Sequence, residues 1–282
     1  MIDTWGLLHT GHHDAATNMA LDEMLLTWHS QGEIPPTLRF YGWTKPTLSL
    51  GHFQRIHRTI DLDAVKRHGC ELVRRLTGGS AVLHDDELTY SLVVSEEKPY
   101  IAASVREAYF TLSKGILEGF KELGIHADYS MPEGKAKGDS TAVCFERASI
   151  YEMLVDRKKI SGHAQTRQKG VLLQHGSLPF TMNKQMLFDL FIFPDEKMRE
   201  AKRSDFSSKA IAMKEAAGRS ITFEEAEIAF QKGFQKGLQL ELVPLELSDS
   251  QWEEVRQLAE TKYRSDDWNI NHRRKVLVSG SQ

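Results

Sequence analysis

The apolar positions in the first part of the chain repeat with a helical period. Asp14 can accept hydrogen bonds from the first turn of a helix, and Gly32 can end one. Between them lies an apolar stripe that consists of Ala16, Met19, Ala20, Leu21, Met24, Leu25 and Trp28. The pattern therefore predicts a helix that begins after Asp14 and ends near Gly32.

The pattern then changes to β-rich runs that are separated by turn residues. Residues 37–43 and 47–51 flank a turn that contains Pro46, which predicts a hairpin or two neighbouring strands. Further runs predict strands at 70–75, 79–84, 87–95, 149–155, 159–167 and 170–180. Capping residues and apolar spacing predict helices at 61–68, 104–123, 184–191, 207–217, 222–239 and 248–263.

The strands occur in clusters that look antiparallel, with helices between and after them. This order differs from a regular alternation of strand and helix. We therefore predict an α+β (mixed α/β) fold in which helices flank a large mixed, mostly antiparallel β-sheet. The sequence has no internal repeat and no long linker that would mark a firm domain boundary.

Composition excludes several classes of protein. The 282 residues carry a formal net charge of −3, whereas a dedicated nucleic-acid binder normally has a basic excess. The two cysteines, Cys70 and Cys144, have no zinc-site spacing and predict no disulfide framework. The chain shows neither a signal-peptide pattern at its start nor an apolar run of bilayer length. We expect a cytoplasmic protein with no metal site and no nucleic-acid or membrane partner.

One stretch, residues 73–85, combines cations with a glycine turn. Arg74 and Arg75 precede Gly78 and Gly79, and an alternating apolar segment follows. Glycines let the main chain approach a ligand closely, and exposed N–H groups beside arginine can bind a carbonyl, carboxylate or phosphate. A solvated strand end is the competing interpretation. On its own the stretch predicts either a ligand cradle or such an end.

A cysteine and a lysine further along the chain are the other candidates for chemistry. Cys144 follows a polar loop that contains two glycines and two lysines, and nearby cations favour the reactive thiolate. Lys159 precedes Ser161-Gly162, where glycine again permits close approach. A lone cysteine is more often a small buried apolar residue, and this alternative is stronger for Cys70. Structural roles are also the simpler interpretation for His84, His163 and His175.

Three segments resemble the signature of a known family. They are Arg74–Asp85, Lys159–Gly162 and Gln174–Ser177, which look like those of the lipoate ligase and octanoyltransferase family, itself related to biotin–protein ligases. Further segments resemble the Bacillus-type octanoyl-acyl-carrier-protein:protein N-octanoyltransferases of that family: 18–23, 39–43, 49–54, 140–145 and 164–167. The likeness extends from about residue 5 to about residue 268.

The resemblance implies a biotin/lipoate-ligase-like catalytic domain over residues 1–248, with a C-terminal helix and tail (249–282) packed on it. It implies that Cys144 becomes an S-octanoyl intermediate and that Lys159 holds the acyl carbonyl. The substrate-binding residues that it implies are Arg74, Arg75, Thr77, Gly78, Gly79, His84, Gly162, His163, His175 and Gly176. Arg74 and Arg75 would shape the mouth of the acyl pocket.

The implied reaction transfers octanoyl from octanoyl-acyl carrier protein to a lysine of a lipoyl domain, first the glycine cleavage H protein. A thioester is already activated, so the resemblance implies no ATP, metal or other cofactor. We expect the enzyme to be a monomer.

Three alternatives remain open at the level of sequence. An octanoyl-H protein:E2 amidotransferase would use the same cysteine with another donor. An ATP-dependent lipoate–protein ligase would use the lysine segment without a cysteine. A non-catalytic acyl-binding module would keep the pocket and lose nothing when the thiol is removed.

Overall fold

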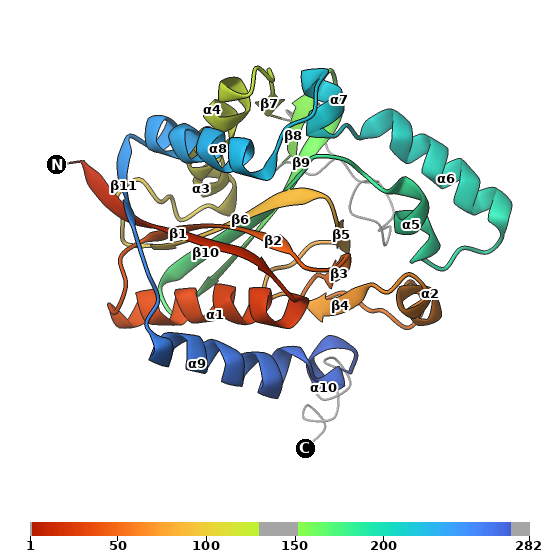
Figure 1. Cartoon of the computed structure of the whole chain (residues 1–282), viewed down its shortest axis with the longest axis horizontal. Helices are drawn as coiled ribbons and strands as arrows, with labels where there is room; N and C mark the ends of the chain where they lie inside the picture. The colour runs from red at the N-terminus through yellow and green to blue at the C-terminus, as the bar shows by residue number, and fades with distance from the viewer. Residues whose placement is uncertain (1, 130–151, 272–282) are drawn as a thin grey trace.

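A computed structural model describes residues 2–129 and 152–271. Helices cover both faces of a large β-sheet, and a smaller sheet lies beside it (Figure 1). Within the described residues, the large sheet has the strand order β11-β1-β2-β6-β10-β9-β8-β7. Its strands are β1 (Asp3–His13), β2 (Thr37–Trp43), β6 (Glu87–Ser95), β7 (Asp128–Tyr129), β8 (Glu152–Val155), β9 (Lys158–Gln168), β10 (Val171–Pro179) and β11 (Leu240–Pro244).

Strand directions in the large sheet are mixed. β1 runs parallel to both β11 and β2, whereas the pairs from β2 through β6, β10, β9 and β8 to β7 are antiparallel. The small sheet consists of β4 (Glu71–Arg74), β3 (Thr47–Leu50) and β5 (Val82–His84), with β3 in the centre. The predicted α+β class with a mostly antiparallel sheet is confirmed.

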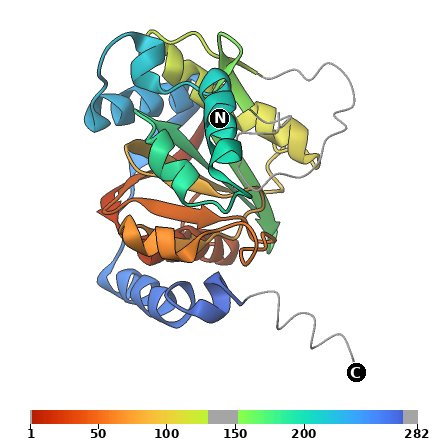
Figure 2. The same cartoon turned by 90° about the vertical axis from the view of Figure 1, so that its right-hand side faces the viewer.

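The helices form two layers on opposite faces of the large sheet (Figures 1 and 2). On one face lie α3 (Val105–Leu112), α4 (Lys114–Glu122) and α8 (Phe223–Leu238). On the other lies α1 (Ala15–Gln31), which is itself covered by α9 (Asp249–Leu258) and the π-helical turn η1 (Ala259–Tyr263). The remaining helices are α2 (Leu62–Arg67), α5 (Lys184–Asp189), α6 (Glu196–Lys209), α7 (Met213–Ala217) and α10 (Asp266–Asn269).

Specific contacts attach the C-terminal segment to α1. Trp28 donates its indole N–H to Glu254, and Glu23 accepts hydrogen bonds from Lys262 and Tyr263. Because Glu23 lies on the side of α1 that faces away from the sheet, it connects α1 to η1, which covers it. None of the helices in the described ranges is long and apolar enough to cross a membrane.

Helix ends were predicted better than strand neighbours. Asp14, Thr222 and Ser248 cap α1, α8 and α9 with their side chains as expected. The prediction of a hairpin or two neighbouring strands at residues 37–43 and 47–51 is wrong, because β2 belongs to the large sheet and β3 to the small one. β1 and β11 were not predicted.

The helix predicted at 104–123 is interrupted. α3 ends at Leu112 and α4 begins at Lys114, with Ser113 between them. The helix predicted at 207–217 is also incorrect, because α6 begins at Glu196 and a break after Lys209 separates it from α7.

Candidate active site

A cavity of ≈ 60 Å³ lies on the α1 side of the large sheet, where the small sheet meets it. Its lining comes from α1, both sheets and the turn between β4 and β5. The lining residues are Met19, Tyr41, Trp43, Ser49, Arg75, Gly79, Val82, His84, Thr89, Gly162, His163, Ala164, His175, Gly176 and Ser177. Most of this surface is apolar, whereas the polar groups come from arginine, histidine and hydroxyl side chains.

The register of the strands places one row of lining residues across the sheet. Gly162 pairs with Ser177, Ser177 with Thr89, and Thr89 with Tyr41. Glu152 of β8 extends the row because it pairs with Gly162. Directly paired residues point to the same face of a sheet, so all five lie on the cavity side.

Lys159 reaches this row through an irregularity in β9. Simple alternation would place residues 159 and 162 on opposite faces, but the register of β8 and β9 shifts between Met153 and Leu154. As a result, Lys159 Cε lies 3.5 Å from the position that a Cβ on Gly162 would occupy. The ammonium of Lys159 is 2.7 Å from Glu152 Oε1, in a buried ion pair. A Cβ at position 162 would contact Lys159, and a longer side chain there would compete with it for this space.

Arg75 shapes the turn that forms one wall of the cavity. Its Nη2 donates to the carbonyls of Gly78 and Ser80, each at 2.8 Å. Between them, Gly79 has a φ of +93°, a conformation that favours glycine. The carbonyl of Gly79 packs so closely on Gly51 that a Cβ at position 51 would lie 1.8 Å from it. The double glycine of the motif therefore serves backbone packing as well as the cavity wall.

Arg74 points elsewhere and is not among the residues that line the cavity. Its buried guanidinium donates to main-chain carbonyls of two segments that are far apart in sequence. The acceptors are the carbonyls of Gly51, His52, Gln54, Trp268 and Asn269. Arg74 thus connects the loop after β3 to α10, which is a structural role. The resemblance implied that both arginines shape the mouth of the acyl pocket. Arg75 lines the cavity, whereas the contacts of Arg74 lie away from it.

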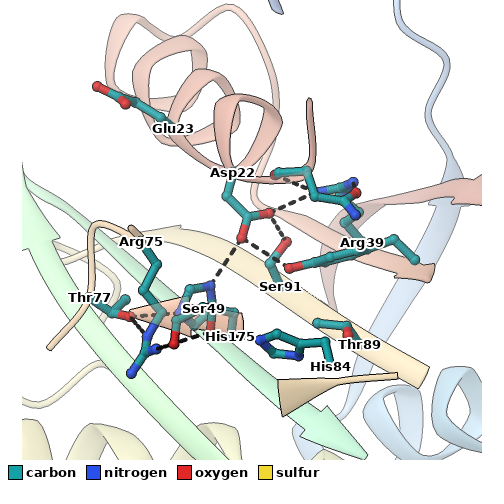
Figure 3. A network of polar contacts seen from close by, with 12 residues as sticks. Asp22, Glu23, Arg39, Ser49, Arg75, Thr77, His84, Thr89, Ser91 and His175 are labelled. Atoms are coloured by element: carbon teal, nitrogen blue, oxygen red, sulfur yellow. Dashed lines mark hydrogen bonds and ion pairs between the residues drawn. The ribbon is translucent and has the colours of Figure 1, made fainter. Parts of the chain in front are cut away.

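His84 and His175 each bridge a buried carboxylate and a hydroxyl group. His175 Nδ1 lies 3.1 Å from Asp22 Oδ2, and its Nε2 lies 2.7 Å from Thr77 Oγ1 (Figure 3). His84 Nδ1 lies 2.7 Å from Glu87 Oε1, and its Nε2 lies 2.8 Å from Ser49 Oγ. The two histidines therefore have the same pattern of partners.

Asp22 and His175 have perturbed pKa values. Burial opposes ionisation of Asp22, but the hydrogen bond from His175 and the charge of Arg39 outweigh it and lower the pKa of Asp22. Burial lowers the pKa of His175, and the contact with Asp22 offsets this only in part. Near neutral pH the pair therefore consists of a carboxylate and a neutral imidazole.

His163 has a different environment at the edge of the cavity. Its Nδ1 lies 3.0 Å from the hydroxyl of Tyr90 and its Nε2 lies 2.8 Å from Ser161 Oγ. Burial, together with the positive charge of Lys159, lowers the pKa of His163 to about 3. Gly176 makes room for this ring, since a Cβ there would lie 2.3 Å from His163 Nδ1.

A second hollow shares Gly79, His163 and Ala164 with the cavity and is also lined by Val105 at the start of α3. Val105 is exposed. The hollow is also lined by Gly78, the other glycine of the turn. A bound chain could therefore pass between the glycine turn and α3.

Most of the predicted residues lie together. Arg75, Gly79, His84, Gly162, His163, His175 and Gly176 line the cavity, and Thr77, Gly78 and Lys159 contact or adjoin that lining. Cys144 lies outside the described residues. Sequence reasoning did not single out Ser49, Glu87 or Glu152. Asp22 was included only within segment 18–23 of the family resemblance, although its i, i+4 spacing from the polar Asn18 in an apolar stripe was a signal for it.

Comparison with known proteins defines the class. The family model "Lipoyl protein ligase A/B catalytic domain" matches residues 14–235. The chain therefore belongs to the lipoyl protein ligase A/B catalytic domain family.

Relatives that match nearly the whole chain include octanoyltransferases. The chain is 52% identical to octanoyltransferase LipM of Oceanobacillus iheyensis, over 93% of this chain and 96% of that protein. It is 48% identical to octanoyltransferase LipM of Bacillus subtilis, over 95% and 98% of the two chains. The chain is thus a member of the octanoyltransferase group, as the sequence motifs predicted.

Solved structures agree on the fold. A bipartite lipoate protein ligase from Thermoplasma acidophilum superimposes with a TM-score of 0.78 at 24% identity and covers 95% of this chain and 96% of its own. A lipoate-protein ligase A bound with ATP superimposes with a TM-score of 0.76, also at 24% identity, and covers 95% and 98%.

Proposed function

We propose that this enzyme transfers an octanoyl group from octanoyl-acyl carrier protein to the ε-amine of a lysine on a lipoyl domain, first the glycine cleavage H protein. The observation that carries the proposal is the identity of 48–52% to octanoyltransferases LipM over nearly the whole chain. The reaction would supply octanoylated protein for lipoate assembly.

The proposed reaction has two steps that share a covalent intermediate. The thiolate of Cys144 attacks the thioester carbonyl, a new C–S bond forms, and the carrier leaves as a thiolate that takes up a proton. The deprotonated lysine amine then attacks the S-octanoyl group, an amide forms, and the Cys144 thiolate leaves while the nitrogen loses its second proton. Both steps begin from an activated thioester, so the proposal includes no ATP and no metal.

Lys159 is the proposed electrostatic partner of this chemistry. Its ammonium comes to the cavity side at Gly162, where it can stabilise the oxyanion that develops in each step. The pair with Glu152 keeps a buried ammonium in place at an ion-pair distance of 2.7 Å. Lys159 therefore combines a fixed position with a positive charge.

The cavity supports the proposed acyl substrate. Tyr41, Trp43 and Val82 supply apolar surface, while Gly79 and Gly162 leave space beside the main chain. Each methylene that is buried contributes about 0.8 kcal/mol, so six of them contribute about 5 kcal/mol. Burial would therefore supply a substantial part of the free energy that binds an eight-carbon chain. We propose that Thr77, Gly78, Gly79, His84, His163, His175 and Gly176 form or support this pocket, with Arg75 behind the glycine turn.

The experiment that tests the proposal is intact-mass measurement after mixing the protein with octanoyl-acyl carrier protein in the absence of ATP. We expect a mass increase of one octanoyl group, located on Cys144 by fragmentation, and its transfer to added H protein. Cys144→Ala should show neither event. Unchanged transfer by Cys144→Ala would rule out the covalent mechanism.

Two further arms separate the alternatives. Octanoyl-H protein offered as donor, with a dehydrogenase E2 lipoyl domain as acceptor, measures the amidotransferase reaction. ATP-dependent pyrophosphate exchange with octanoate measures the ligase reaction. We expect octanoyl-acyl carrier protein to be the faster donor and pyrophosphate exchange to stay at background.

A further inference from the structure

Two chains of hydrogen bonds lead from buried carboxylates to Arg75. We call the first the aspartate relay, which consists of Asp22, His175 and Thr77. We call the second the glutamate relay, which consists of Glu87, His84 and Ser49. Each relay joins a carboxylate, an imidazole and a hydroxyl group in the same order.

Both relays end on the same guanidinium. Arg75 Nε donates to Thr77 Oγ1 at 3.1 Å, and Arg75 Nη1 donates to Ser49 Oγ at 3.1 Å. The two relays come from different parts of the fold, since Thr77 belongs to the turn after β4 and Ser49 to β3. Figure 3 labels Arg75 together with Asp22, His175 and Thr77 of the aspartate relay and with His84 and Ser49 of the glutamate relay.

Donor and acceptor chemistry allows one direction along each relay in which both histidines are neutral. An arginine can only donate, so both hydroxyl oxygens accept from Arg75. Each hydroxyl proton is then directed to a histidine Nε2, which must be unprotonated to accept it. Each histidine consequently carries its proton on Nδ1 and donates it to a carboxylate. In this scheme every hydrogen bond has one donor and one acceptor, both carboxylates are ionised and both histidines are neutral.

The charges of the aspartate relay agree with this scheme. The pKa of Asp22 is lowered, mainly because the hydrogen bond from His175 and the charge of Arg39 overcome its burial, and burial lowers the pKa of His175. Asp22 is 1% exposed and Thr77 is fully buried. A relay of this kind cannot exchange its partners for water without opening the structure.

Additional contacts hold the carboxylate end of the glutamate relay. Glu87 accepts hydrogen bonds from Thr89 and from Ser177, the latter at 2.6 Å. The ring of His84 stacks on Trp43 with 4.3 Å between ring centroids. Position and rotation of the imidazole are therefore both fixed.

The order of groups in the glutamate relay also occurs in the triads of serine hydrolases, where the hydroxyl oxygen faces the substrate. Here Arg75 donates to Ser49 Oγ and also to the carbonyl of Ser49. The hydroxyl oxygen therefore faces a cation that belongs to the wall of the cavity. This orientation favours a positioning role over a nucleophilic one.

We propose that the aspartate relay and the glutamate relay are positioning devices for Arg75, and through it for the turn at Gly78–Gly79. Arg75 passes the constraint on, because its Nη2 holds the carbonyls of Gly78 and Ser80. The turn lines the cavity, so the relays fix the wall against which the octanoyl group of the proposed reaction is held. The statement about the octanoyl group rests on the proposed function, whereas the positioning of Arg75 does not.

The first test does not depend on activity. Histidine labelled with ¹⁵N in the full-length protein allows the tautomers of His84 and His175 to be read at pH 7 from two-bond couplings between ring protons and nitrogens, with single His→Gln variants for assignment. We expect both rings to be neutral with the proton on Nδ1. A proton on Nε2 of either ring, or an imidazolium, would overturn the proposed direction of that relay.

The second test breaks each relay at its hydroxyl group. Thr77→Val replaces the hydroxyl of Thr77 by a methyl group of the same shape, and Thr77→Ser keeps the hydroxyl as the matched variant. Ser49→Ala breaks the other relay. We expect Thr77→Val and Ser49→Ala to accelerate hydrogen exchange of Arg75 Nε–H, and Thr77→Ser to restore its protection. Unchanged exchange in both broken variants would overturn the positioning role.

Single-turnover acylation of Cys144 supplies the functional readout. We expect Thr77→Val and Ser49→Ala each to slow it by about tenfold, the effect of losing one hydrogen bond to a charged group, and Thr77→Ser to recover most of the rate. The double variant should be slower by less than the product of the single effects, because both relays act on Arg75. Fully multiplicative effects would contradict convergence on Arg75. If the wild-type protein transfers no octanoyl group, the proposed function fails, whereas the tautomer and exchange results still decide the relays.

Discussion

The ammonium of Lys159 lies 2.7 Å from the carboxylate of Glu152, and both side chains are 6% exposed. The two residues come from neighbouring strands, β9 and β8, and meet on the cavity side because the register shifts between Met153 and Leu154. Taking two charges out of water is costly unless each remains close to its partner. The ion pair therefore fixes the lysine that we propose as the electrostatic group of the reaction.

Removing Glu152 should both destabilise the fold and displace Lys159. For Glu152→Ala we expect the free energy of unfolding to fall by about 3–5 kcal/mol, because a buried ammonium loses its partner. Urea unfolding measures this change. Single-turnover octanoyl transfer, measured well below the melting temperature, should slow at least about tenfold if the ammonium moves away from the carbonyl.

The matched control for this prediction removes both charges. Lys159→Met together with Glu152→Ala should be more stable than Glu152→Ala alone, since no unpaired charge remains. The same double variant should lose most transfer because the lysine is absent. Additive losses of stability would show that the two residues do not act as a pair.

Arg74 should matter for stability much more than for catalysis. Arg74→Lys keeps the charge but cannot reproduce the set of hydrogen bonds that joins the carbonyls of residues 51–54 to those of Trp268 and Asn269. We expect it to lower the free energy of unfolding by at least about 2 kcal/mol and to accelerate proteolysis near α10. The transfer rate per folded molecule should change little. A large loss of rate without a loss of stability would place Arg74 at the mouth of the pocket after all.

Two glycines of the site should respond differently to a methyl group. In Gly176→Ala the new Cβ would lie 2.3 Å from His163 Nδ1 and 2.7 Å from Tyr90 Cε1, so we expect a loss of about 1–3 kcal/mol in thermal or urea unfolding. In Gly78→Ala the new Cβ would have no heavy atom within 4 Å among the residues that the structure describes, its chain neighbours aside.

Gly78→Ala should therefore fold with an unchanged melting temperature. Any slower acylation in this variant would report contact between the turn and the substrate, as we expect if the turn is a wall of the acyl pocket. Equal stability of both variants would show that the packing around Gly176 relaxes readily.

The fold could be predicted where local signals were strong. The strand at 87–95 was predicted at its observed limits, and the caps of α1, α8 and α9 follow directly from Asp14, Thr222 and Ser248. β1 was missed because glycines and histidines interrupt its apolar pattern. It is stabilised by parallel pairing with β11, which lies more than 200 residues away and which no local pattern reveals.

The sequence predicted the residues of the family motifs in the candidate site. It did not predict the buried polar residues that hold those motif residues in place. Glycines and basic residues in short segments are visible in a sequence, whereas Glu87, Thr89 and Ser91 look like ordinary polar positions of a strand. Their spacing of two residues places them on one buried face, which was an available signal. That this face meets Asp22 of α1 depends on tertiary packing and could not be read from the sequence.

His163 should make stability depend on pH in mildly acidic solution. Its pKa is about 3 in the folded protein because of burial and the charge of Lys159, against 6.5 for an unperturbed histidine. Between these values the unfolded state binds a proton that the folded state does not, so stability is lost as the pH falls. The contribution is up to about 1.4 kcal/mol per pH unit below pH 6.5.

Urea unfolding of wild type and His163→Gln between pH 7 and pH 4 isolates this contribution, because the other titrating groups are common to both proteins. We expect the stability difference between the two proteins to shrink as the pH falls. His57→Gln, at an exposed position, is the control for replacing a histidine by glutamine. A difference that stays constant over this range would mean that His163 is protonated as readily in the folded protein as in the unfolded chain.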